Sequence, residues 1–331
     1  MSRVVAVVGA TGVVGREMLK TLERRNFPTS RVIALASGRS KGTRIPFRGG
    51  DLIVEELTAE SFVGVDIALF SAGGGTSKEY APIAAAAGAV VIDNSSAWRM
   101  DPDCPLVVPE VNAGALKHRP KGIIANPNCS TIQMMVALKP LHDAARIKHI
   151  VVSTYQATSG KGNAALEELR AQTKAVAAGE KPVVSVFPKQ IYGNVTCDWP
   201  AGEGGYSEEE LKMVKETKKI LGDESIGVTP TCVRVPVERG HSESIHVQFH
   251  RPMSRTEALD LLRNAPGVQL YEGDYRPGGE PSPLETAETE ATHVGRVRED
   301  LAVKGAINLW VVSDNLAKGA ALNAVQVAEI L

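Results

Sequence analysis

Short apolar runs alternate with helical patterns through the first 130 or so residues of the chain. The runs at 3–9, 31–37, 65–72, 89–95 and 122–127 are rich in Val, Ile and Ala and show no polar alternation. Continuous runs of this kind are typical of parallel strands that are buried on both faces of a sheet. Residues 13–25 have helical periodicity and separate the first two runs. The pattern predicts an α/β fold with a doubly wound domain of the Rossmann type.

The second half of the chain has a different pattern. Residues 149–158 and 233–250 have β character with alternation of apolar and polar positions, as in an antiparallel sheet open on one side. Helical periodicity appears at 130–146, 163–178 and 208–221. Pro140 is expected to end or kink the first of these helices. With a predicted strand at 306–314 and a helix at 317–330, the pattern indicates an α+β domain with a largely antiparallel sheet.

We place the domain boundary near residue 130. A chain of 331 residues is long enough for two cores, and we assign residues 1–129 to the first domain and 130–314 to the second. The C-terminal segment, 315–331, is expected to return to the first domain as a helix and so make that domain discontinuous. The Pro/Gly-rich stretch 181–206 receives no function beyond an interface or a loop that covers a site.

Composition and charge exclude several classes of protein. Lys and Arg number 37 against 38 Asp and Glu, so the formal net charge of −1 gives no reason to expect a nucleic acid or an anionic membrane as partner. No apolar run approaches the roughly 20 residues of a membrane helix. The four cysteines form no C-x-x-C pair and no His/Cys/Asp cluster has ligand spacing, which argues against a disulfide framework and a metal site. We expect a cytoplasmic protein without a metal.

The segment GATGVVG contains Gly9, Gly12 and Gly15 and follows a predicted buried strand. The first two glycines permit a tight turn and close approach to a phosphate, and the third permits close packing of helix on strand. Free N–H groups and the helix dipole attract a pyrophosphate. The segment therefore predicts a dinucleotide site. The alternative is a turn between strand and helix that binds nothing.

The end of the second strand indicates which dinucleotide binds. NAD sites usually have an acidic residue about 20 residues after the glycine turn. Here Ser37, Arg39, Ser40 and Lys41 occupy that place. A cationic loop rich in hydroxyl groups suits the 2′-phosphate of NADP, so we predict NADP as the cofactor. The alternative is a solvated basic loop.

Cys129, in NPNCST, follows a proline-containing turn at the predicted start of a helix. A helix N-terminus lowers the pKa of a thiol and favours the nucleophilic thiolate. The alternative is a buried apolar thiol, which is the usual environment of an unpaired cysteine. We assign that environment to Cys104, Cys197 and Cys232.

A nucleophilic cysteine also needs a group that carries protons, and seven histidines are candidates. His241 follows a glycine between two strand-like runs, and spacing alone prefers it modestly. His246 and His250 share a strand face with Gln248, which indicates ordinary exposed positions. The remaining four, His118, His142, His149 and His293, are predicted at the surface of helices or loops.

Several separated segments together resemble the aspartate-semialdehyde dehydrogenases, and the bacterial branch is the most similar. These segments are GATGVVG, SAGGGTS at 71–77, NSSAWRM from residue 94, NPNCST, TYQATSGKG at 154–162, RVPVERGHSES and SDNLAKGAA at 313–321. The resemblance runs the length of the chain, and the order of the segments is more specific than any one motif. It implies a Rossmann-type NADP-binding domain and a catalytic and dimerisation domain.

The resemblance also implies roles for individual residues. Cys129 matches the catalytic cysteine, His241 the acid/base histidine and Gln156 the glutamine that orients the substrate. Arg234 matches the arginine that binds the substrate α-carboxylate, and Arg99 the arginine of the phosphate subsite. Lys212 is similar to the partner of that arginine, and Glu209 to the carboxylate that receives the substrate amino group. The family contacts NADP at positions matching Thr11, Gly12, Val13, Val14, Ser159, Gly160 and Asn315.

The residue types suit these roles chemically. A guanidinium binds a carboxylate through two parallel hydrogen bonds, which an ammonium cannot do. Two cations suit a phosphate leaving group, and a carboxylate suits an ammonium. For Glu209 and Lys212 the alternative is a solvated pair on one helix face, at spacing i,i+3.

The implied reaction is the NADPH-dependent reduction of L-4-aspartyl phosphate to L-aspartate 4-semialdehyde, with release of phosphate. It passes through an acyl-thioester on Cys129, and His241 protonates the oxyanion. The product feeds lysine, threonine and methionine synthesis, and the resemblance implies a homodimer. One alternative is N-acetyl-γ-glutamyl-phosphate reductase, which has no use for Glu209 as a receiver of an ammonium. Another is a catalytically silent relative that binds NADP.

Overall fold

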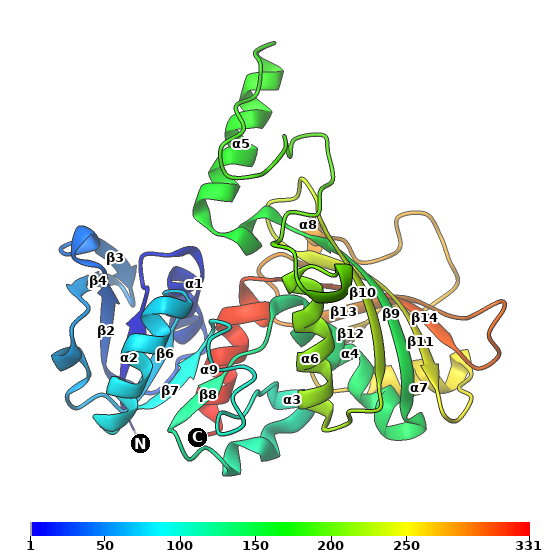
Figure 1. The fold of residues 1–331 in the computed structure, drawn as a ribbon, viewed down its shortest axis with the longest axis horizontal. Coiled ribbons are helices and arrows are strands. Elements are labelled where there is room, and N and C mark those ends of the chain that lie inside the picture. The colour runs from blue at the N-terminus through cyan, green and yellow to red at the C-terminus, as the bar shows by residue number, and fades with distance from the viewer. Residues whose placement is uncertain (1) are drawn as a thin grey trace. The chain divides into compact units, whose positions relative to one another are not determined.

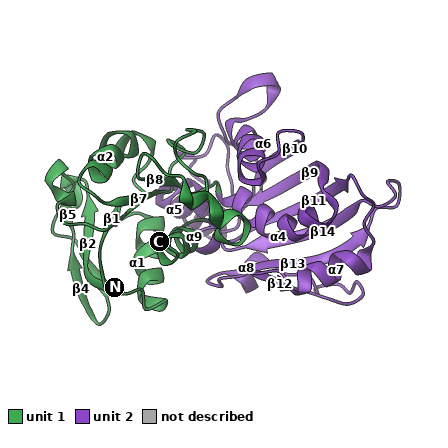
Figure 2. Cartoon of the chain, turned by 90° about the horizontal axis from the view of Figure 1, so that it is seen from below, with its two compact units in different colours: residues 1–128, 320–331 green, residues 129–319 purple. Residues whose placement is uncertain are grey.

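The computed structural model describes residues 2–331, and the chain forms two compact units. Unit 1 consists of residues 1–128 and 320–331, and unit 2 consists of residues 129–319 (Figure 2). The last residues of the chain therefore belong to the same unit as the first.

Unit 1 is built on a six-stranded sheet in the order β5-β2-β1-β6-β7-β8. Figure 1 labels β2, β6, β7 and β8 of this sheet. The strands are β1 (Arg3–Val8), β2 (Thr29–Ala36), β5 (Glu55–Glu56), β6 (Ile67–Phe70), β7 (Val90–Asp93) and β8 (Ile123–Ala125). All five pairings are parallel, as the continuous apolar runs predict. The prediction of an α/β fold with a Rossmann-type first domain is confirmed.

Alternate residues of β1 enter two different hydrophobic clusters, which is why the strand is apolar throughout. Val5 and Val7 join the cluster that includes residues of α1 (Val13–Arg24) and α9 (Leu322–Glu329). Ala6 and Val8 join a second cluster that includes residues of α2 (Gly74–Ala86). Helices thus cover both faces of the sheet. A short hairpin of β3 (Arg44–Phe47) and β4 (Gly50–Ile53) was not predicted.

The C-terminal helix is shorter than predicted. Residues 317–321 form a π-helical turn, and the α-helix α9 begins only at Leu322. Asn323 in its first turn donates hydrogen bonds to the Val107 carbonyl at 2.9 Å and to Asn126 Oδ1 at 2.7 Å. These bonds join α9 to segments of unit 1 that lie about 200 residues earlier in the chain.

Unit 2 contains a mixed six-stranded sheet in the order β10-β9-β11-β14-β13-β12. The strands are β9 (Ile147–Gln156), β10 (Gly227–Arg234), β11 (His241–Phe249), β12 (Val268–Leu270), β13 (Thr292–Glu299) and β14 (Ile307–Ser313). The three central pairings are antiparallel, and the two outer ones, β10 with β9 and β12 with β13, are parallel. The predicted antiparallel character therefore holds for the middle of the sheet.

The predicted β segment 233–250 is divided between two strands. β10 ends at Arg234 and β11 begins at His241, on opposite sides of β9. The chain therefore passes across the end of β9 between these residues. This crossing determines the geometry of the candidate site.

Helix α4 (Cys129–Ala145) packs against β9, β11, β13 and β14 and against the helices α6 (Glu208–Leu221) and α7 (Arg255–Arg263). Pro140 lies inside α4, so of the prediction that it ends or kinks this helix, the ending is wrong. A proline costs a helix interior roughly 3 kcal/mol. Twelve of the helix residues are buried, and this packing offsets the cost. The other helices of unit 2 are α5 (Asn163–Ala177) and α8 (Pro283–Thr286).

Candidate active site

Cys129 is the first residue of α4 and is half-buried. The N–H groups of a first helical turn stabilise a thiolate. The other cysteines differ. Cys104 and Cys232 are buried, and burial is the main cause that raises the pKa of Cys232. Cys197 is exposed, so the expectation of a buried apolar thiol is wrong there, because its segment runs along the surface.

Gly319 packs directly against the cysteine. A Cβ atom on Gly319 would lie 3.0 Å from Cys129 Cβ, which is tighter than ordinary van der Waals contact. The segment SDNLAKGAA therefore has a steric reason for glycine at this position.

Three strand ends bring buried polar side chains to one end of the unit 2 sheet. Gln156 is the last residue of β9, Arg234 the last of β10 and His241 the first of β11. Arg234 and Gln156 are register partners, and Ser242 pairs with Tyr155. All three site side chains have exposed fractions of 2% or less.

The surroundings of His241 determine its protonation state. Its Nδ1 accepts a hydrogen bond from the Ala157 N–H at 3.0 Å, so Nδ1 carries no proton. Complete burial, and then the charge of Arg234, hold the pKa of His241 well below its ordinary value. The ring is therefore neutral at neutral pH, with its proton on Nε2. Within residues 2–331, Nε2 has no hydrogen-bond partner.

Arg234 is fixed by three groups. Its Nη1 donates to the Ala157 carbonyl at 2.8 Å, and its Nε lies 3.3 Å from Asp198 Oδ1. The guanidinium carbon lies 4.5 Å from the centre of the Trp199 ring. A guanidinium has five N–H donors, so donors remain for a substrate carboxylate. The stretch 181–206 thus has a definite role, because it supplies the residues that hold Arg234.

Gly160 lies against both of these side chains. A Cβ atom there would be 3.0 Å from Arg234 Nη1 and 3.1 Å from His241 Nε2. Only a glycine leaves this space without displacing the imidazole or the guanidinium.

Glu209 and Lys212 form an ion pair at 3.1 Å on the first turns of α6. The i,i+3 pair of the alternative reading is therefore present, but Glu209 is buried rather than solvated. Its second oxygen accepts from Gln156 Nε2 at 3.4 Å. The three side chains form one polar row between β9 and α6.

Ser159 and Asn315 are bonded to each other, with Asn315 Nδ2 at 3.0 Å from Ser159 Oγ. Asn315 Oδ1 also accepts from the Gly240 N–H at 2.8 Å. Both side chains are buried. Asn315 therefore fixes the backbone immediately before His241.

Arg99 is buried in unit 1, where it donates to the carbonyls of Asn126 and Asn94, each at 2.9 Å. Asn126 Nδ2 in turn donates to Asn94 Oδ1 at 2.7 Å. Arg99 is thus bound to the chain three residues before Cys129.

The glycine turn has the geometry that its sequence predicts. Gly9 has a φ of +83°, and a Cβ on Gly15 would lie 2.1 Å from the Gly9 carbonyl oxygen. α1 begins at Val13 with no side-chain cap and no acidic residue in its first turn. Its first N–H groups face no competing carboxylate of that turn, which suits a pyrophosphate.

An acidic residue lies beside the predicted 2′-phosphate loop. Glu56 of β5 pairs with Lys41 at 3.6 Å, and a Cβ on Gly38 would lie 2.8 Å from Glu56 Oε1. The sequence around residue 40 does not reveal this carboxylate, because strand pairing brings it there. Arg39 is exposed on the same loop.

Comparison with known proteins shows the family of the chain. A family model described as semialdehyde dehydrogenase, NAD binding domain, matches residues 4–119, and one described as semialdehyde dehydrogenase, dimerisation domain, matches residues 138–318. The aspartate-semialdehyde dehydrogenase of Aquifex aeolicus is 54% identical, over 99% of this chain and 97% of its own. The chain belongs to the aspartate-semialdehyde dehydrogenases.

Two further relatives support membership in this family. The Bacillus subtilis aspartate-semialdehyde dehydrogenase is 49% identical over 99% of this chain and 96% of its own. The crystal structure of the Vibrio cholerae enzyme II, complexed with ASA, has a TM-score of 0.97 at 47% identity and covers 100% of this chain and 98% of that one. The predicted aspartate-semialdehyde dehydrogenase activity is therefore confirmed over both alternatives.

Sequence reasoning within this family missed several residues that hold the site. Asp198 and Trp199 lie 36 and 35 positions before Arg234 and have no spacing signal. Asp314 accepts hydrogen bonds from Leu316, Arg239 and Glu288, and its only signal was its place in SDNLAKGAA. Glu243, two residues after His241, is completely buried.

Two histidines do not lie where the sequence predicted. His142 and His293 were expected at the surface, but their exposed fractions are 2% and 7%. His142 Nδ1 accepts from the Ile147 N–H, and His293 bonds to Tyr271 and Thr289. Each ring has a local partner, which is what makes its burial tolerable.

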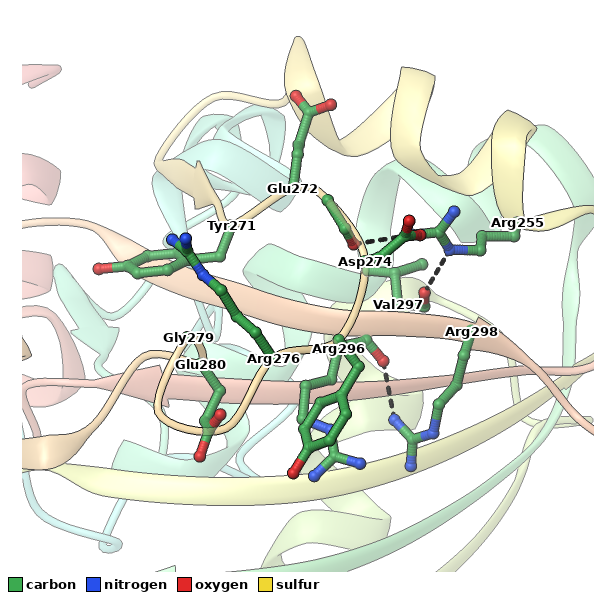
Figure 3. A pocket seen from close by; sticks show the side chains of 12 residues that line it. Arg255, Tyr271, Glu272, Asp274, Arg276, Gly279, Glu280, Arg296, Val297 and Arg298 are labelled. Atoms are coloured by element: carbon green, nitrogen blue, oxygen red, sulfur yellow. Dashed lines mark hydrogen bonds between the residues drawn. The ribbon is translucent and has the colours of Figure 1, made fainter.

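Unit 2 also contains a cavity of about 410 Å³ at the edge of its sheet (Figure 3). Arg255, Arg276, Arg296 and Arg298 line it together with two tyrosines. None of the predicted site residues lines this cavity. Across the described residues, no group of three or more His, Cys, Asp or Glu side chains is placed to hold a metal.

Proposed function

We propose that the chain reduces L-4-aspartyl phosphate to L-aspartate 4-semialdehyde through an acyl-thioester on Cys129, with NADPH as reductant. The observation that carries the proposal is the convergence of Gln156, Arg234 and His241 at one end of the unit 2 sheet. The chemistry of each buried side chain fits one part of an acyl phosphate substrate.

The first step is attack by the Cys129 thiolate on the acyl carbon. Phosphate leaves as the carbon–sulfur bond forms, and Arg99 and Lys212 stabilise its charge. Arg234 binds the α-carboxylate with the donors that Asp198 and Ala157 leave available. Glu209 receives the α-ammonium, and Gln156 orients the acyl group. The fixed guanidinium supports this role because it holds the substrate without reorganisation.

NADPH supplies a hydride to the thioester carbon when it is bound. The oxygen of the thioester then becomes an oxyanion, and His241 Nε2–H donates a hydrogen bond to it. Protonation of the oxyanion by His241, as the sequence resemblance implies, would require an imidazolium as proton donor. The low pKa of His241 disfavours that form. The neutral imidazole therefore stabilises the oxyanion through a hydrogen bond, as an electrophile. Collapse of the oxyanion breaks the carbon–sulfur bond and returns the Cys129 thiolate.

The first unit contains a nicotinamide-dinucleotide domain, and a solved relative from Candida albicans with NADP has a TM-score of 0.79 at 26% identity, covering 100% of this chain and 98% of that one. We propose NADP as the cofactor of this chain. It would lie on Gly9, Thr11, Gly12, Val13, Val14 and Gly15, with Ser37, Arg39 and Ser40 at the 2′-phosphate and Ser159, Gly160 and Asn315 as further contacts.

Arg39→Ala is expected to raise KM for NADP about tenfold and leave KM for NAD unchanged, since one charge-assisted bond contributes about 1.5–3 kcal/mol. Equal changes for both cofactors would exclude Arg39 from this role.

Other parts of the proposal concern assembly and location. The second unit contains a dimerisation domain, and we propose a homodimer that forms through the open face of its sheet. We also propose a cytoplasmic enzyme whose product serves lysine, threonine and methionine synthesis. None of the helices in residues 2–331 has the length and apolar character needed to cross a membrane.

The decisive experiment follows the reverse reaction. The protein is incubated with aspartate semialdehyde, phosphate and NADP, and reduced nicotinamide is followed by absorbance. We expect phosphate-dependent reduction that Cys129→Ala abolishes, while Cys197→Ala, at an exposed thiol, retains it. Full activity of Cys129→Ala would exclude the thioester on Cys129. The same assay with N-acetylglutamate semialdehyde should give no reduction.

A further inference from the structure

Glu243 is a buried carboxyl that the reaction outlined above does not use. It lies on β11 two residues after His241, on the same face of the strand. Its exposed fraction is 0%, and neither of its carboxyl oxygens has a hydrogen-bond partner in residues 2–331. An unsatisfied buried carboxyl costs stability, so its presence beside a catalytic histidine requires an explanation.

Gln133 is a second buried polar side chain, and it lies on a helix that packs against β11. It lies on α4 four residues after Cys129, which is one helical turn along the same face. Its exposed fraction is 0%, and its amide nitrogen and oxygen likewise have no hydrogen-bond partner in the described chain. α4 packs against β11, so each of these polar groups is the partner available to the other. A hydrogen-bonded pair of Glu243 and Gln133 would connect the turn after Cys129 to the strand that begins with His241.

We propose that Glu243, as a neutral carboxylic acid paired with Gln133, is a positioning residue that fixes the first turns of α4 against β11 and so sets how Cys129 faces His241. This inference rests on the proposed roles of Cys129 and His241.

The chemistry of the two groups suits a reciprocal pair. A protonated carboxyl donates through its O–H to the amide oxygen and accepts from the amide N–H, so each group satisfies the other. An ionised carboxylate could only accept. Burial raises the pKa of Glu243 well above its ordinary value, and the Gln133 amide is the only group that opposes this rise.

The other neighbours of Glu243 support the neutral form. On the flanking strands its register partners are Thr154 of β9 and Val311 of β14, and neither is ionisable. Farther across the sheet, Glu243 interacts electrostatically with the Cys232 thiol, and burial keeps that thiol protonated and uncharged. No cation from α4, β9 or β14 contributes to the pKa of Glu243, so no positive charge there favours a carboxylate.

If Glu243 only stabilised the fold, an apolar side chain at this position would cost less free energy to bury. Replacing both members of a buried polar pair with apolar groups of similar shape is often neutral or stabilising. A polar pair specifies one geometry instead, because its hydrogen bonds are directional. Fixing a helix turn that carries a nucleophile is a use for such a pair.

The test compares Glu243→Leu, Glu243→Met and Glu243→Gln in the phosphate-dependent assay. We expect the two apolar variants to lower kcat about tenfold with KM changed less than about twofold, since displacing reacting groups by a fraction of an ångström affects the chemical step. Glu243→Gln can form a reciprocal amide pair and should keep kcat within about threefold of wild type. The rate of Cys129 carbamidomethylation by iodoacetamide, read by mass spectrometry of its peptide, should fall with kcat.

A swap and a packing control complete the test. Gln133→Leu should lower kcat as Glu243→Leu does, and the double variant should lose no more than either one. Gln133→Glu combined with Glu243→Gln exchanges the partners and should keep kcat within about threefold of wild type. Ile245→Ala removes packing from the same buried face, and it should lower stability while kcat is retained.

Three results would overturn the inference. One is wild-type kcat in both apolar variants. Another is a loss in Glu243→Gln as large as in Glu243→Met, which would mean that a carboxylate is needed. The third is a loss of kcat in Ile245→Ala equal to that in Glu243→Met at equal unfolding free energy. Failure of the proposed mechanism is separate, because it appears as activity in Cys129→Ala whatever the Glu243 variants do.

Discussion

At the scale of single residues, burial decides which form each site group takes. His241 is neutral because its ring is fully buried beside Arg234, and one backbone N–H selects its tautomer. Arg234 is equally buried, and Asp198 and the Ala157 carbonyl accept hydrogen bonds from its guanidinium. In the same buried surroundings, His241 is a neutral hydrogen-bond donor and Arg234 a cation, and only Arg234 has a carboxylate partner.

Gly160→Ala tests how tightly this arrangement is held. The added Cβ would lie about 3 Å from Arg234 Nη1 and His241 Nε2, so one of these groups must move. We expect kcat to fall about tenfold while the unfolding free energy changes little, because Gly160 has no positive φ. Steady-state kinetics and urea unfolding measure both effects. Unchanged kcat would show that neither group acts from its observed position.

Glu243→Gln should also change the pH dependence of stability. The folded state raises the pKa of Glu243, so above the ordinary value of about 4.3 the folded protein binds a proton that the unfolded chain has released. Wild-type stability therefore falls as pH rises from that value towards the raised pKa. Glutamine has no such cost, so the advantage of the variant should grow over this window and vanish below it. Urea midpoints that differ by the same amount at every pH would contradict a raised pKa.

At the scale of elements, two features of unit 2 create the site. The chain crosses the end of β9 between Arg234 and His241, which puts both beside Gln156. Helix α6 then presents Glu209 and Lys212 from its first turns, and a capping box fixes its start. In that box Glu210 accepts from the Ser207 N–H at 2.7 Å and from the Cys232 N–H at 2.9 Å. The cap therefore joins the helix to β10.

The two ends of α6 provide a matched comparison. Ser207→Ala removes the cap and should destabilise the protein by about 1 kcal/mol. Gly222→Ala places a Cβ at a φ of +64° and should cost about as much, roughly 1 kcal/mol. We expect only Ser207→Ala to lower kcat/KM, because the first turn carries Glu209. Equal kinetic losses in both variants would mean that overall stability, rather than the helix start, controls the rate.

At the scale of the whole molecule, the unit 2 sheet has one face covered by α4 and one face with exposed apolar residues. Val151 and Tyr155 on β9 have exposed fractions of 38% and 37%, and the Tyr155 ring lies 5.5 Å from that of Trp310 on β14. Apolar side chains on an open sheet face are suited to a subunit interface. This is the face through which we propose that two copies associate.

Val151→Glu tests the interface. A charge at the centre of a buried contact costs several kcal/mol when it has no partner, so we expect monomers at concentrations where the wild type is dimeric. Sedimentation velocity measures the change. Val63→Glu, at another exposed apolar residue in unit 1, should leave the sedimentation coefficient unchanged. A Val151→Glu variant that sediments as the wild type would exclude this face.

The sequence by itself determined the features that depend on neighbouring residues. Gly9 and Gly15 predict a tight turn because their constraints are local: Gly9 has a positive φ, and Gly15 contacts Gly9 six residues earlier. Buried strands of unit 1 are apolar at every position, so their pattern is visible without the fold. The order of several motifs also indicated the family and, through it, the residues of the candidate site.

Only the tertiary structure decided what distant segments supply to each other. Asp198 holds Arg234, and the packing of α4 against β11 buries Gln133 and Glu243 on neighbouring elements although 110 positions of sequence separate them. Glu56 reaches the loop after β2 because β5 pairs with that strand. Pro140 stays inside a helix because packing outweighs its local cost. Burial and hydrogen bonding are properties of the assembled core, and therefore they appear in the fold and have no signature in a single stretch of sequence.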